Sequence, residues 1–505
     1  MTMADIEIPP MGDPGERAMP CLKPGAMAAS KPYVATAVHN EPLGFPGELV
    51  PDWQEKGIAR MGELLGKYKS LQVFMDICVK CGACTDKCHY FIGTNDPKNM
   101  PVARQDLFRS VYRRYFTPAG KALGSVGLGK LVGAREFTKD VLDEWFNYFH
   151  QCSQCRRCSV FCPYGIDTAE VSMAARDIMD NIGLGHKYAN EILGKVHKIG
   201  NNLGLPGPAL IDNLEGLEED LKDETGLDIR MPVDEAGAEI LLVTPSADYF
   251  AEPHVLGLMG YAKVFHAAGT SWTVSTKATE AANFALFIGN YEQMRKVAMR
   301  IREAALELGV KRIVFGECGH AWRVAYSFLN TLIGPMDFLD PRYPAPQHIL
   351  EFTYDLIKRG GIKLDKSGND GMVLTFHDSC NVARASRMGD FEGGQFVIPR
   401  EVIKACVPKF VDMHPDTTHE KTFCCGGGGG LLTDELMDLR IKGAAPRMEA
   451  LTDVAKREGV THMAAICAIC KAQFTKVLPT YGFDREMVVS VHQLVSNAII
   501  LGNND

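Results

Sequence analysis

The sequence of 505 residues lacks any run of eighteen apolar residues, about the length needed to cross a bilayer. Even its apolar C-terminal stretch is interrupted by His492, Gln493 and Asn497. The first residues contain neither the basic region nor the apolar region of a secretory signal. The net charge of -8 provides no basic field that would attract nucleic acid. We therefore expect a cytoplasmic protein that neither spans a membrane by itself nor binds nucleic acid.

Cysteine, in contrast, is abundant. The chain has 16 cysteines, and most of them lie in a few tight groups. In a reducing cytosol, such groups are typical of metal or cluster ligation rather than of disulfides. The count by itself favours an iron–sulfur protein.

The pattern of residues predicts an α + α/β fold class. Residues 1–60 are rich in Pro, Gly and Ala and read as an extended arm, either disordered or ordered on a partner. Residues 61–200 are expected to be a helical ferredoxin domain, and residues 201–237 an acidic linker. Beyond it, short apolar segments alternate with amphipathic ones such as 291–309, which predicts parallel α/β structure. The expected strands are 239–245, 285–289, 312–316, 371–378 and 462–467.

A faint internal repeat divides this α/β region into residues 238–365 and residues 366–505. The segments 312–323 and 463–474 both read as an apolar strand, a cysteine-containing turn and a helix. In this register Cys318 corresponds to Cys470, and Phe315 replaces Cys467. We interpret the region as two related halves, of which only the second keeps its full set of cysteines.

Two cysteine quartets share the spacing C-x2-C-x2-C-x3-C. Three such thiolates can reach three corners of one cubane, while the remote fourth ligates the neighbouring cluster in two-cluster ferredoxins. The spacing therefore assigns one [4Fe–4S] cluster to Cys78, Cys81, Cys84 and Cys162, and a second to Cys88, Cys152, Cys155 and Cys158. A pair of zinc knuckles is the alternative, although zinc motifs rarely use this spacing twice. His89 follows the first quartet where Pro163 follows the second, and it either tunes a cluster or is an ordinary packed histidine.

The stretch between the quartets is basic. Residues 98–139 carry Lys or Arg at nine positions and Asp or Glu at two, around the apolar, glycine-rich segment ALGSVGLGKLVG. One interpretation is a solvated basic face; the other is docking against anionic headgroups or against a membrane subunit.

The C-terminal half contains Cys380, then Cys424 and Cys425 side by side before five glycines, then Cys467 and Cys470. This arrangement resembles the CCG domain of heterodisulfide reductases. The resemblance implies that these five thiolates bind a noncubane [4Fe–4S] cluster, with zinc as the alternative. Gly426 and Gly427 are then expected to let the backbone approach that cluster closely.

The resemblance extends over residues 60–505, because a two-cluster ferredoxin domain precedes the CCG region. The stretch CVKCGACTDKCHYFIGTNDPKNMPVARQDLFRSVYRRYF, together with one complete and one eroded CCG half, is similar to the K-subunit (DsrK) family of the DsrMKJOP complexes of sulfur-metabolising prokaryotes. It implies a quinol-oxidising haem b membrane subunit (DsrM-like) and the other DsrMKJOP subunits as partners. It also implies the protein DsrC as substrate, through a disulfide or trisulfide, at the cytoplasmic face of the inner membrane. The alternative is an electron-relay subunit of a flavin-dependent glycolate, lactate or glycerol-3-phosphate dehydrogenase complex.

Three residues of the first half are candidates for contact with substrate. Cys318 is either a thiol that meets the substrate, an additional ligand or a buried remnant. His320 and Arg323 are expected to supply a proton and an anion contact, with packing as the alternative role. His377 and Asp378 are expected to orient the loop of Cys380, while Cys21 and Cys406 are expected to be inert.

Overall fold

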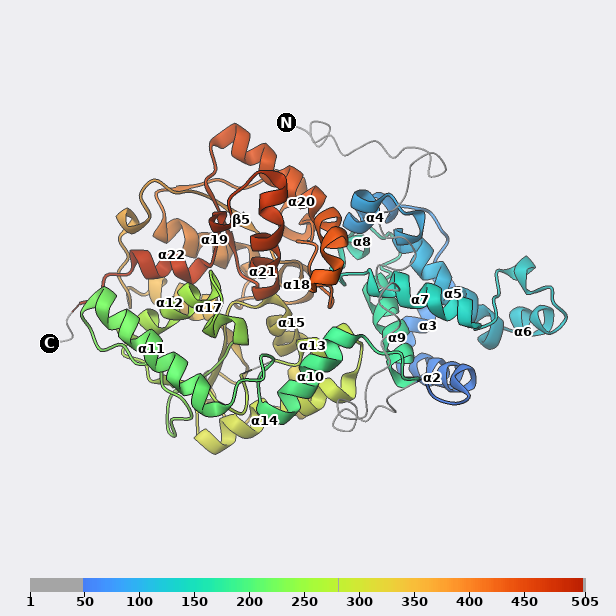
Figure 1. Cartoon of the computed structure of the whole chain (residues 1–505), viewed down its shortest axis with the longest axis horizontal. Helices are drawn as coiled ribbons and strands as arrows, with labels where there is room; N and C mark the ends of the chain where they lie inside the picture. The colour runs from blue at the N-terminus through green and yellow to red at the C-terminus, as the bar shows by residue number, and fades with distance from the viewer. Residues whose placement is uncertain (1–48, 280, 503–505) are drawn as a thin grey trace. The chain divides into compact units, whose positions relative to one another are not determined.

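The computed structural model describes residues 49–279 and 281–502 (Figure 1). The arm expected over residues 1–60 falls mostly outside these residues, as does Cys21. Within them, a helix already begins at Trp53.

The chain divides into two compact units that do not follow the order of the sequence. The first unit comprises the chain up to Gly194 together with two later segments, Phe284–Asn290 and Phe423–Arg447. The second unit comprises Lys195–Asn283, Tyr291–Thr422 and the chain from Met448 onward. Each half of the predicted repeat therefore contributes one short segment to the first unit.

The first unit is helical around an aromatic core. Phe108 stacks on Trp145 with ring centroids 5.1 Å apart, and Phe137 and Phe149 pack against the same indole. Leu431, Leu436 and Leu439 belong to this core, although they come from the C-terminal part of the chain. The helices that begin in the unit are α2 (Trp53–Lys67), α3 (Lys69–Ile77), α4 (His89–Thr94), α5 (Pro101–Phe116), α6 (Pro118–Ser125), α7 (Lys139–His150), α8 (Arg157–Val160), α9 (Thr168–Asn181), α10 (Lys187–Ile199) and α20 (Met437–Glu458).

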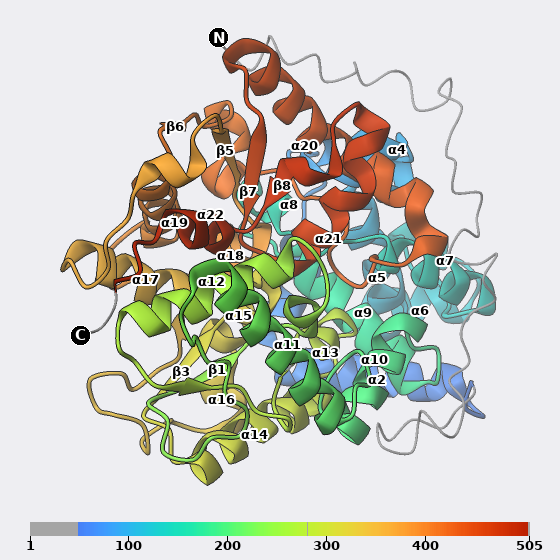
Figure 2. The same ribbon diagram turned by 60° about the vertical axis from the view of Figure 1, so that its left-hand side comes forward.

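The second unit contains two small parallel sheets (Figure 2). Their strand orders are β2-β1-β3-β4 and β6-β5-β7-β8, so the two sheets have the same topology. The strands are β1 (Ile240–Val243), β2 (Trp272–Thr273), β3 (Arg312–Phe315) and β4 (Gln347–His348), then β5 (Val373–His377), β6 (Lys409–Phe410), β7 (His462–Ala465) and β8 (Val488–Val489). The helices around them are α11 (Gly207–Thr225), α12 (His254–Ala267), α14 (Tyr291–Leu308), α15 (Gly319–Ser327), α16 (Leu329–Ile333), α17 (Ile349–Lys358), α18 (Cys380–Ala385), α19 (Gly394–Cys406), α21 (Ala468–Val477) and α22 (Val491–Ala498).

Four of the five expected strands are present, and the strand predicted at 285–289 is not. The segment 285–289 lies mostly in a short helix, α13 (Asn283–Phe287), because a buried apolar run of this length fits a helix as well as a strand. The acidic stretch within 201–237 forms the 19-residue helix α11. Its leucines recur at helical spacing and are buried, namely Leu210, Leu214, Leu217 and Leu221, while its carboxylates lie between them.

Among the helices of the described residues, none combines the length and the apolar character that a membrane crossing requires.

Candidate functional site

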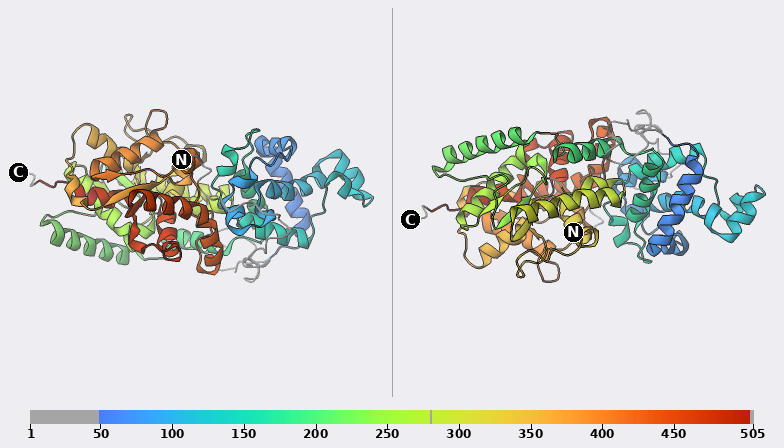
Figure 3. Two further views of the ribbon diagram at one scale, coloured as in Figure 1. Left: turned by 90° about the horizontal axis from the view of Figure 1, so that it is seen from above. Right: turned by 90° about the horizontal axis from the view of Figure 1, so that it is seen from below.

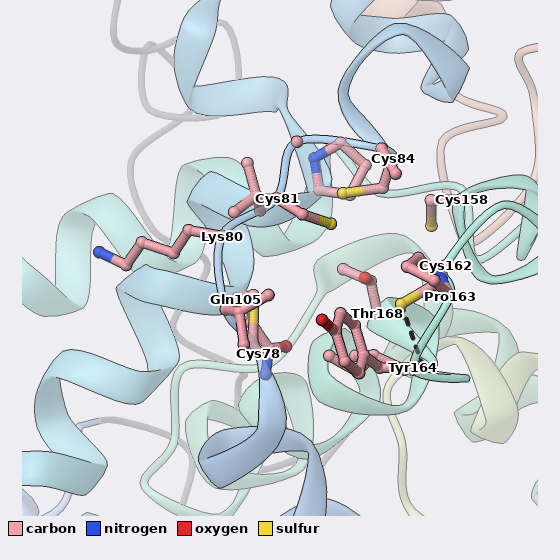
Figure 4. Close-up of a pocket in the computed structure, with 16 residues that line it drawn as sticks. Cys78, Lys80, Cys81, Cys84, Gln105, Cys158, Cys162, Pro163, Tyr164 and Thr168 are labelled. Carbon is pink, nitrogen blue, oxygen red and sulfur yellow. Dashed lines mark hydrogen bonds between the residues drawn. The ribbon is translucent and has the colours of Figure 1, made fainter.

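One pocket of the first unit is lined by thiols of both quartets (Figure 4). Cys78, Cys81 and Cys84 come from the first quartet, and Cys158 and Cys162 from the second. In Figure 4 the sulfur atoms of Cys81, Cys84 and Cys162 point toward the same space. Burial raises the pKa of the Cys84 thiol to about 11, so a bound cation is needed to keep it as a thiolate at neutral pH.

A second pocket is lined by Cys88, Cys152, Cys155 and Cys158. Arg104 Nη1 lies 3.6 Å from Cys88 Sγ. Burial opposes ionisation of Cys88, but the positive charges of Arg104 and His89 lower the pKa of this thiol below its usual value. Thiols are the ligands of iron–sulfur clusters, and each pocket is lined by at least four of them. The donor sets fit two clusters with the exchanged fourth cysteine, although the ligand assignment itself stays a prediction.

The backbone winds around both pockets in the same way. Lys80 and Gln154 stand at equivalent positions of the two quartets and have φ values of 57° and 56°. Gly82 and Arg156 are also equivalent and have φ values of 78° and 62°. Left-handed conformations are unfavourable for residues other than glycine, so they persist where the surrounding structure requires them. Here they turn successive cysteines toward one space.

The double-cysteine run belongs to the same compact unit as the quartets. Tyr90 Oη donates to Gly426 O at 2.6 Å, and Cys424 is a hydrogen-bond partner of His89. His89 also contacts Gly443 O through Nδ1 at 2.6 Å and Ser153 Oγ through Nε2 at 2.7 Å. Burial alone would lower the pKa of His89, but the contacts with Cys424 and Cys88 raise it. His89 therefore links a thiol of the second pocket to a thiol of the CCG run.

Two glycines of this run, Gly426 and Gly429, lie where side chains do not fit. Gly426 has φ 92°, and a Cβ there would lie 2.8 Å from Arg440 O and 2.9 Å from Ala444 N. Gly429 has φ 67°, and its Cβ would lie 2.8 Å from Cys152 O. Positive φ also occurs at Gly430. The close neighbours of Gly426 belong to α20, so the expectation that Gly426 and Gly427 let the backbone approach a cluster stays a prediction.

Two arginines that the sequence did not single out hold these segments together. Arg176 is buried and donates to the carbonyl oxygens of Phe149, Cys152, Phe287 and Gly429 at 2.6 to 3.0 Å. Burial lowers its pKa to about 10, so it stays protonated at neutral pH. Arg157 stacks on the Phe423 ring with its guanidinium carbon 3.8 Å from the centroid. These contacts could not be predicted from sequence spacing, because the partners are remote along the chain.

In the second unit, Cys318 and Cys467 occupy matching positions. Each is the N-cap of the helix that follows an equivalent strand, Cys318 before α15 and Cys467 before α21, with φ near the same value, -139° and -136°. The structure thus pairs Cys318 with Cys467, whereas the sequence register paired it with Cys470. This shift of three residues has two parts: the sequence register displaced β3 against β7 by two residues, and the turn after β3 has one more residue than the turn after β7.

Cys318, Cys467 and Cys470 lie close together with His320. His320 Nδ1 is 3.5 Å from Cys467 Sγ. Burial opposes ionisation of Cys467, but hydrogen bonds from Cys318, Cys470 and His320 lower the pKa of its thiol well below the usual value. This is the environment of a thiol that is held as a thiolate, whether for ligation or for exchange.

Cys380 begins α18, after a two-residue turn that follows β5. Arg323 Nη1 donates to Asn381 Oδ1 at 3.1 Å, and Asn381 Nδ2 lies 3.7 Å from Cys380 Sγ. This contact agrees with the packed role for Arg323, while its role as an anion contact stays a prediction. Asp378 pairs with Arg400 through both carboxylate oxygens at 2.8 Å and accepts from His419 N, so it orients the loop of Cys380. His377 packs against the Phe474 ring.

A fully buried charged cluster adjoins these thiols, and sequence reasoning missed it. Glu317 precedes Cys318 and accepts from His492 Nδ1 at 2.7 Å and from Lys471 Nζ at 3.4 Å. Lys471 follows Cys470 and also donates to Ser490 Oγ at 2.7 Å. Burial opposes ionisation of Glu317, but Lys471 and His492 lower its pKa to about 2. Glu317 belongs to the first half of the α/β region, and Lys471 and His492 belong to the second. The cluster therefore joins the two halves next to the turns that carry Cys318 and Cys470.

Two further observations concern cysteine and metal ligation. Burial raises the pKa of Cys406 to about 12, which agrees with the expectation that this thiol is inert. Within residues 49–279 and 281–502, no group of three Cys, His, Asp or Glu side chains is placed so that it could hold a single metal ion.

Comparison with known proteins adds three findings. Residues 74–166, which contain both quartets, match the family model of a 4Fe–4S dicluster domain. The pockets therefore belong to an iron–sulfur domain rather than to zinc knuckles. No solved structure matches the chain.

Relatives that match most of the chain are also found. The chain is 44% identical to the Hdr-like menaquinol oxidoreductase iron–sulfur subunit 2 of Archaeoglobus fulgidus, over 90% of this chain and 85% of the relative. It is 41% identical to the corresponding subunit of Archaeoglobus profundus, over 90% and 84%. A subunit of the dihydromethanophenazine:CoB–CoM heterodisulfide reductase of Methanosarcina barkeri is 26% identical over 85% of this chain and 95% of the relative.

Proposed function

This chain belongs to the family of Hdr-like menaquinol oxidoreductase iron–sulfur subunits, and we propose on that basis that it connects quinol oxidation to reduction of a sulfur–sulfur bond. As an oxidoreductase subunit it carries iron–sulfur clusters. In the proposed reaction a quinol and a disulfide give a quinone and two thiols. Two electrons and two protons leave the quinol, and the sulfur–sulfur bond accepts them as it breaks.

We infer three cluster sites. Two are cubane sites, one with Cys78, Cys81, Cys84 and Cys162, the other with Cys88, Cys152, Cys155 and Cys158. The third is a noncubane site with Cys380, Cys424, Cys425, Cys467 and Cys470. When bound, the clusters would supply storage and transfer of single electrons between a two-electron donor and a two-electron acceptor.

One observation carries the proposal. The double-cysteine run is packed against residues of the second pocket, through Tyr90 on Gly426 and through His89 between Cys88 and Cys424. This continuity within one compact unit supports electron transfer from the quartets to the CCG thiols. Cys318 and His320, beside Cys467, are the groups proposed to meet the sulfur substrate and to hold a proton for the departing thiolate.

The finer proposal follows the family resemblance. The donor would be a haem b membrane subunit of the DsrM type within a DsrMKJOP-like complex, at the cytoplasmic face of the membrane. The acceptor would be a disulfide or trisulfide of DsrC. Arg323 is kept as a candidate anion contact, although its bond to Asn381 supports a positioning role.

Electron paramagnetic resonance of the anaerobically purified chain tests the proposal. We expect a paramagnetic species that appears on oxidation only when a thiol-bearing partner is added. Cys425→Ser should abolish this species, whereas Cys406→Ala, which removes a buried thiol outside the groups, should keep it. If the thiol changes nothing and the chain instead binds a flavoprotein tightly, an electron relay is the better description.

A further inference from the structure

Residues 118–133, called here the apolar finger, form an exposed apolar surface of the first unit. The finger consists of α6 and a short 3-10 turn at Gly129–Val132. Val126 is 66% exposed, Leu128 50% and Leu131 76%, all within six consecutive residues. Figures 1 and 3 show α6 and the following turn extending away from the other helices of their unit. Clustered exposed aliphatic side chains of this kind mark interaction surfaces.

The finger lies in a part of the chain without acidic residues. Between Asp106 and Glu136 the sequence has no Asp or Glu. The basic side chains in this interval are Arg109, Arg113, Arg114, Lys121, Lys130 and Arg135. Lys121 and Lys130 belong to the finger itself and are exposed. Any surface that accepts the finger must therefore tolerate both apolar side chains and positive charge.

A charged groove of about 350 Å³ adjoins the base of the finger. Five cations line it, namely Lys80, Lys98, Arg109, Arg113 and Arg135, against the two carboxylates Asp106 and Glu144. Each carboxylate is already paired with two cations: Asp106 with Lys80 and Arg109, and Glu144 with Arg135 and Lys98. The groove thus keeps an excess of positive charge that suits an anion.

Arg113 connects the groove to the finger. It lines the groove and donates from Nη1 to Val132 O at 3.3 Å, inside the finger. A Cβ at Gly133 would lie 2.8 Å from the same Nη1, and the φ of 65° at Gly133 itself favours glycine. This hydrogen bond therefore joins a cation of the groove to the backbone of the finger.

We propose that the apolar finger and the groove form a docking surface for a bilayer that contains anionic phospholipid. Val126, Leu128 and Leu131 insert at the boundary between headgroups and acyl chains, and the groove binds a headgroup phosphate. A free phosphate would use only the groove and leave the aliphatic side chains in water, so the apolar finger favours the lipid. Lys80 lines both this groove and the pocket of Cys78, Cys81 and Cys84, so docking brings that pocket beside the bilayer.

Vesicle flotation of the intact iron-loaded chain tests the proposal without any turnover, and so separately from the proposed function. The probes are vesicles of phosphatidylcholine alone and of phosphatidylcholine with about one-third phosphatidylglycerol. We expect binding to the anionic vesicles only, weakened at high salt because the Debye length falls to about 3 Å at 1 M.

Variants separate the two parts of the surface. Leu128→Asp with Leu131→Asp should weaken binding at least about tenfold, and Lys121→Gln with Lys130→Gln about fivefold per charge removed. Leu306→Asp, at a similarly exposed leucine on α14, is the matched control and should change binding less than about twofold. Iron content and visible absorbance must stay unchanged in all of them.

Three outcomes would overturn the proposal. The wild-type chain fails to float with anionic vesicles; the double aspartate variant floats as well as the wild type; or the chain binds native membranes only while their proteins are intact. The last result would assign the finger to a protein partner. A shift from dimer to monomer in the aspartate variant, without vesicle binding by the wild type, would assign it to a second copy of the chain.

Discussion

Gly426 shows how one residue connects the backbone to the candidate site. Its φ of 92° lies in the left-handed region, and its backbone lies against Arg440, Gly443 and Ala444 of α20. Tyr90 meanwhile donates to its carbonyl oxygen. Any side chain at this position strains the turn that carries Cys424 and Cys425.

We predict that Gly426→Ala impairs assembly at the CCG cysteines while sparing both quartets. Iron quantification should show a loss of about four irons per chain, and the cubane signals in the resonance spectrum should persist. Gly482→Ala, at another positive-φ glycine with no heavy atom within 4 Å, is the control for backbone strain alone and should keep the full iron content. Full iron content in the Gly426 variant would contradict the prediction.

Asp180 is a buried carboxylate of the first unit that accepts from Asn290 Nδ2 at 3.1 Å and from Asn190 Nδ2 at 3.3 Å. Burial raises its pKa to about 8, against about 4 in the unfolded chain. A raised folded-state pKa means that its contribution to stability is fully present below about pH 4 and is lost as the pH rises through about 8.

We predict that the free energy of unfolding falls between pH 5 and 8 by up to about 1.4 kcal/mol per pH unit from this group. Asp180→Asn keeps the shape of the side chain but removes its charge. The free energy of unfolding of this variant should therefore change less over the same pH range. Thermal unfolding of both proteins at several pH values measures the difference. Parallel curves for the two proteins would exclude Asp180 as the cause.

At the scale of elements, the buried Glu317, Lys471 and His492 join the turn after β3 to α21 and α22. Removing one partner of such a pair leaves an uncompensated buried charge, which typically costs about 3–5 kcal/mol. Removing both partners costs less, since no charge is then left alone.

We predict that Lys471→Met destabilises the protein by about 3 kcal/mol and that adding Glu317→Gln restores a large part of this loss. A double-mutant cycle on the unfolding free energy gives the coupling between the two residues. Additive effects of the two substitutions would show that the ion pair is not what the single variant loses.

Some helices and strands could be predicted from the sequence and others could not. The strands β1, β3, β5 and β7 were predicted from short apolar runs between turn signals, and in these four cases the structure agrees. The helix α13 and the register of Cys318 were predicted wrongly, because a short apolar run has no periodicity that would fix its secondary structure or its position against a related segment.

At the scale of the whole molecule, the two units differ in the interactions that stabilise their folds. The first unit contains both quartets and the double-cysteine run, in loops with several left-handed residues. The second unit is built on two four-stranded parallel sheets. Cluster binding should therefore contribute more to the folding of the first unit.

We predict that iron removal under anaerobic conditions lowers the unfolding temperature of the first unit and leaves the sheets of the second folded. Limited proteolysis followed by mass spectrometry should show early cleavage within residues 78–88 and 152–162, and late cleavage within residues 312–315 and 462–465. Simultaneous cleavage of both sets would contradict this view.

The sequence by itself determined the iron–sulfur character of the protein, because the spacing of the two quartets is local, and it also showed the α/β character of residues beyond 238. Only the tertiary structure decided which remote residues meet. It brought His89 beside Cys424, gathered four carbonyl oxygens on Arg176, buried Lys471 against Glu317 and placed Cys318 beside Cys467. Such contacts depend on how long loops close and on which charges can be buried together, and neither property is written in the spacing of neighbouring residues.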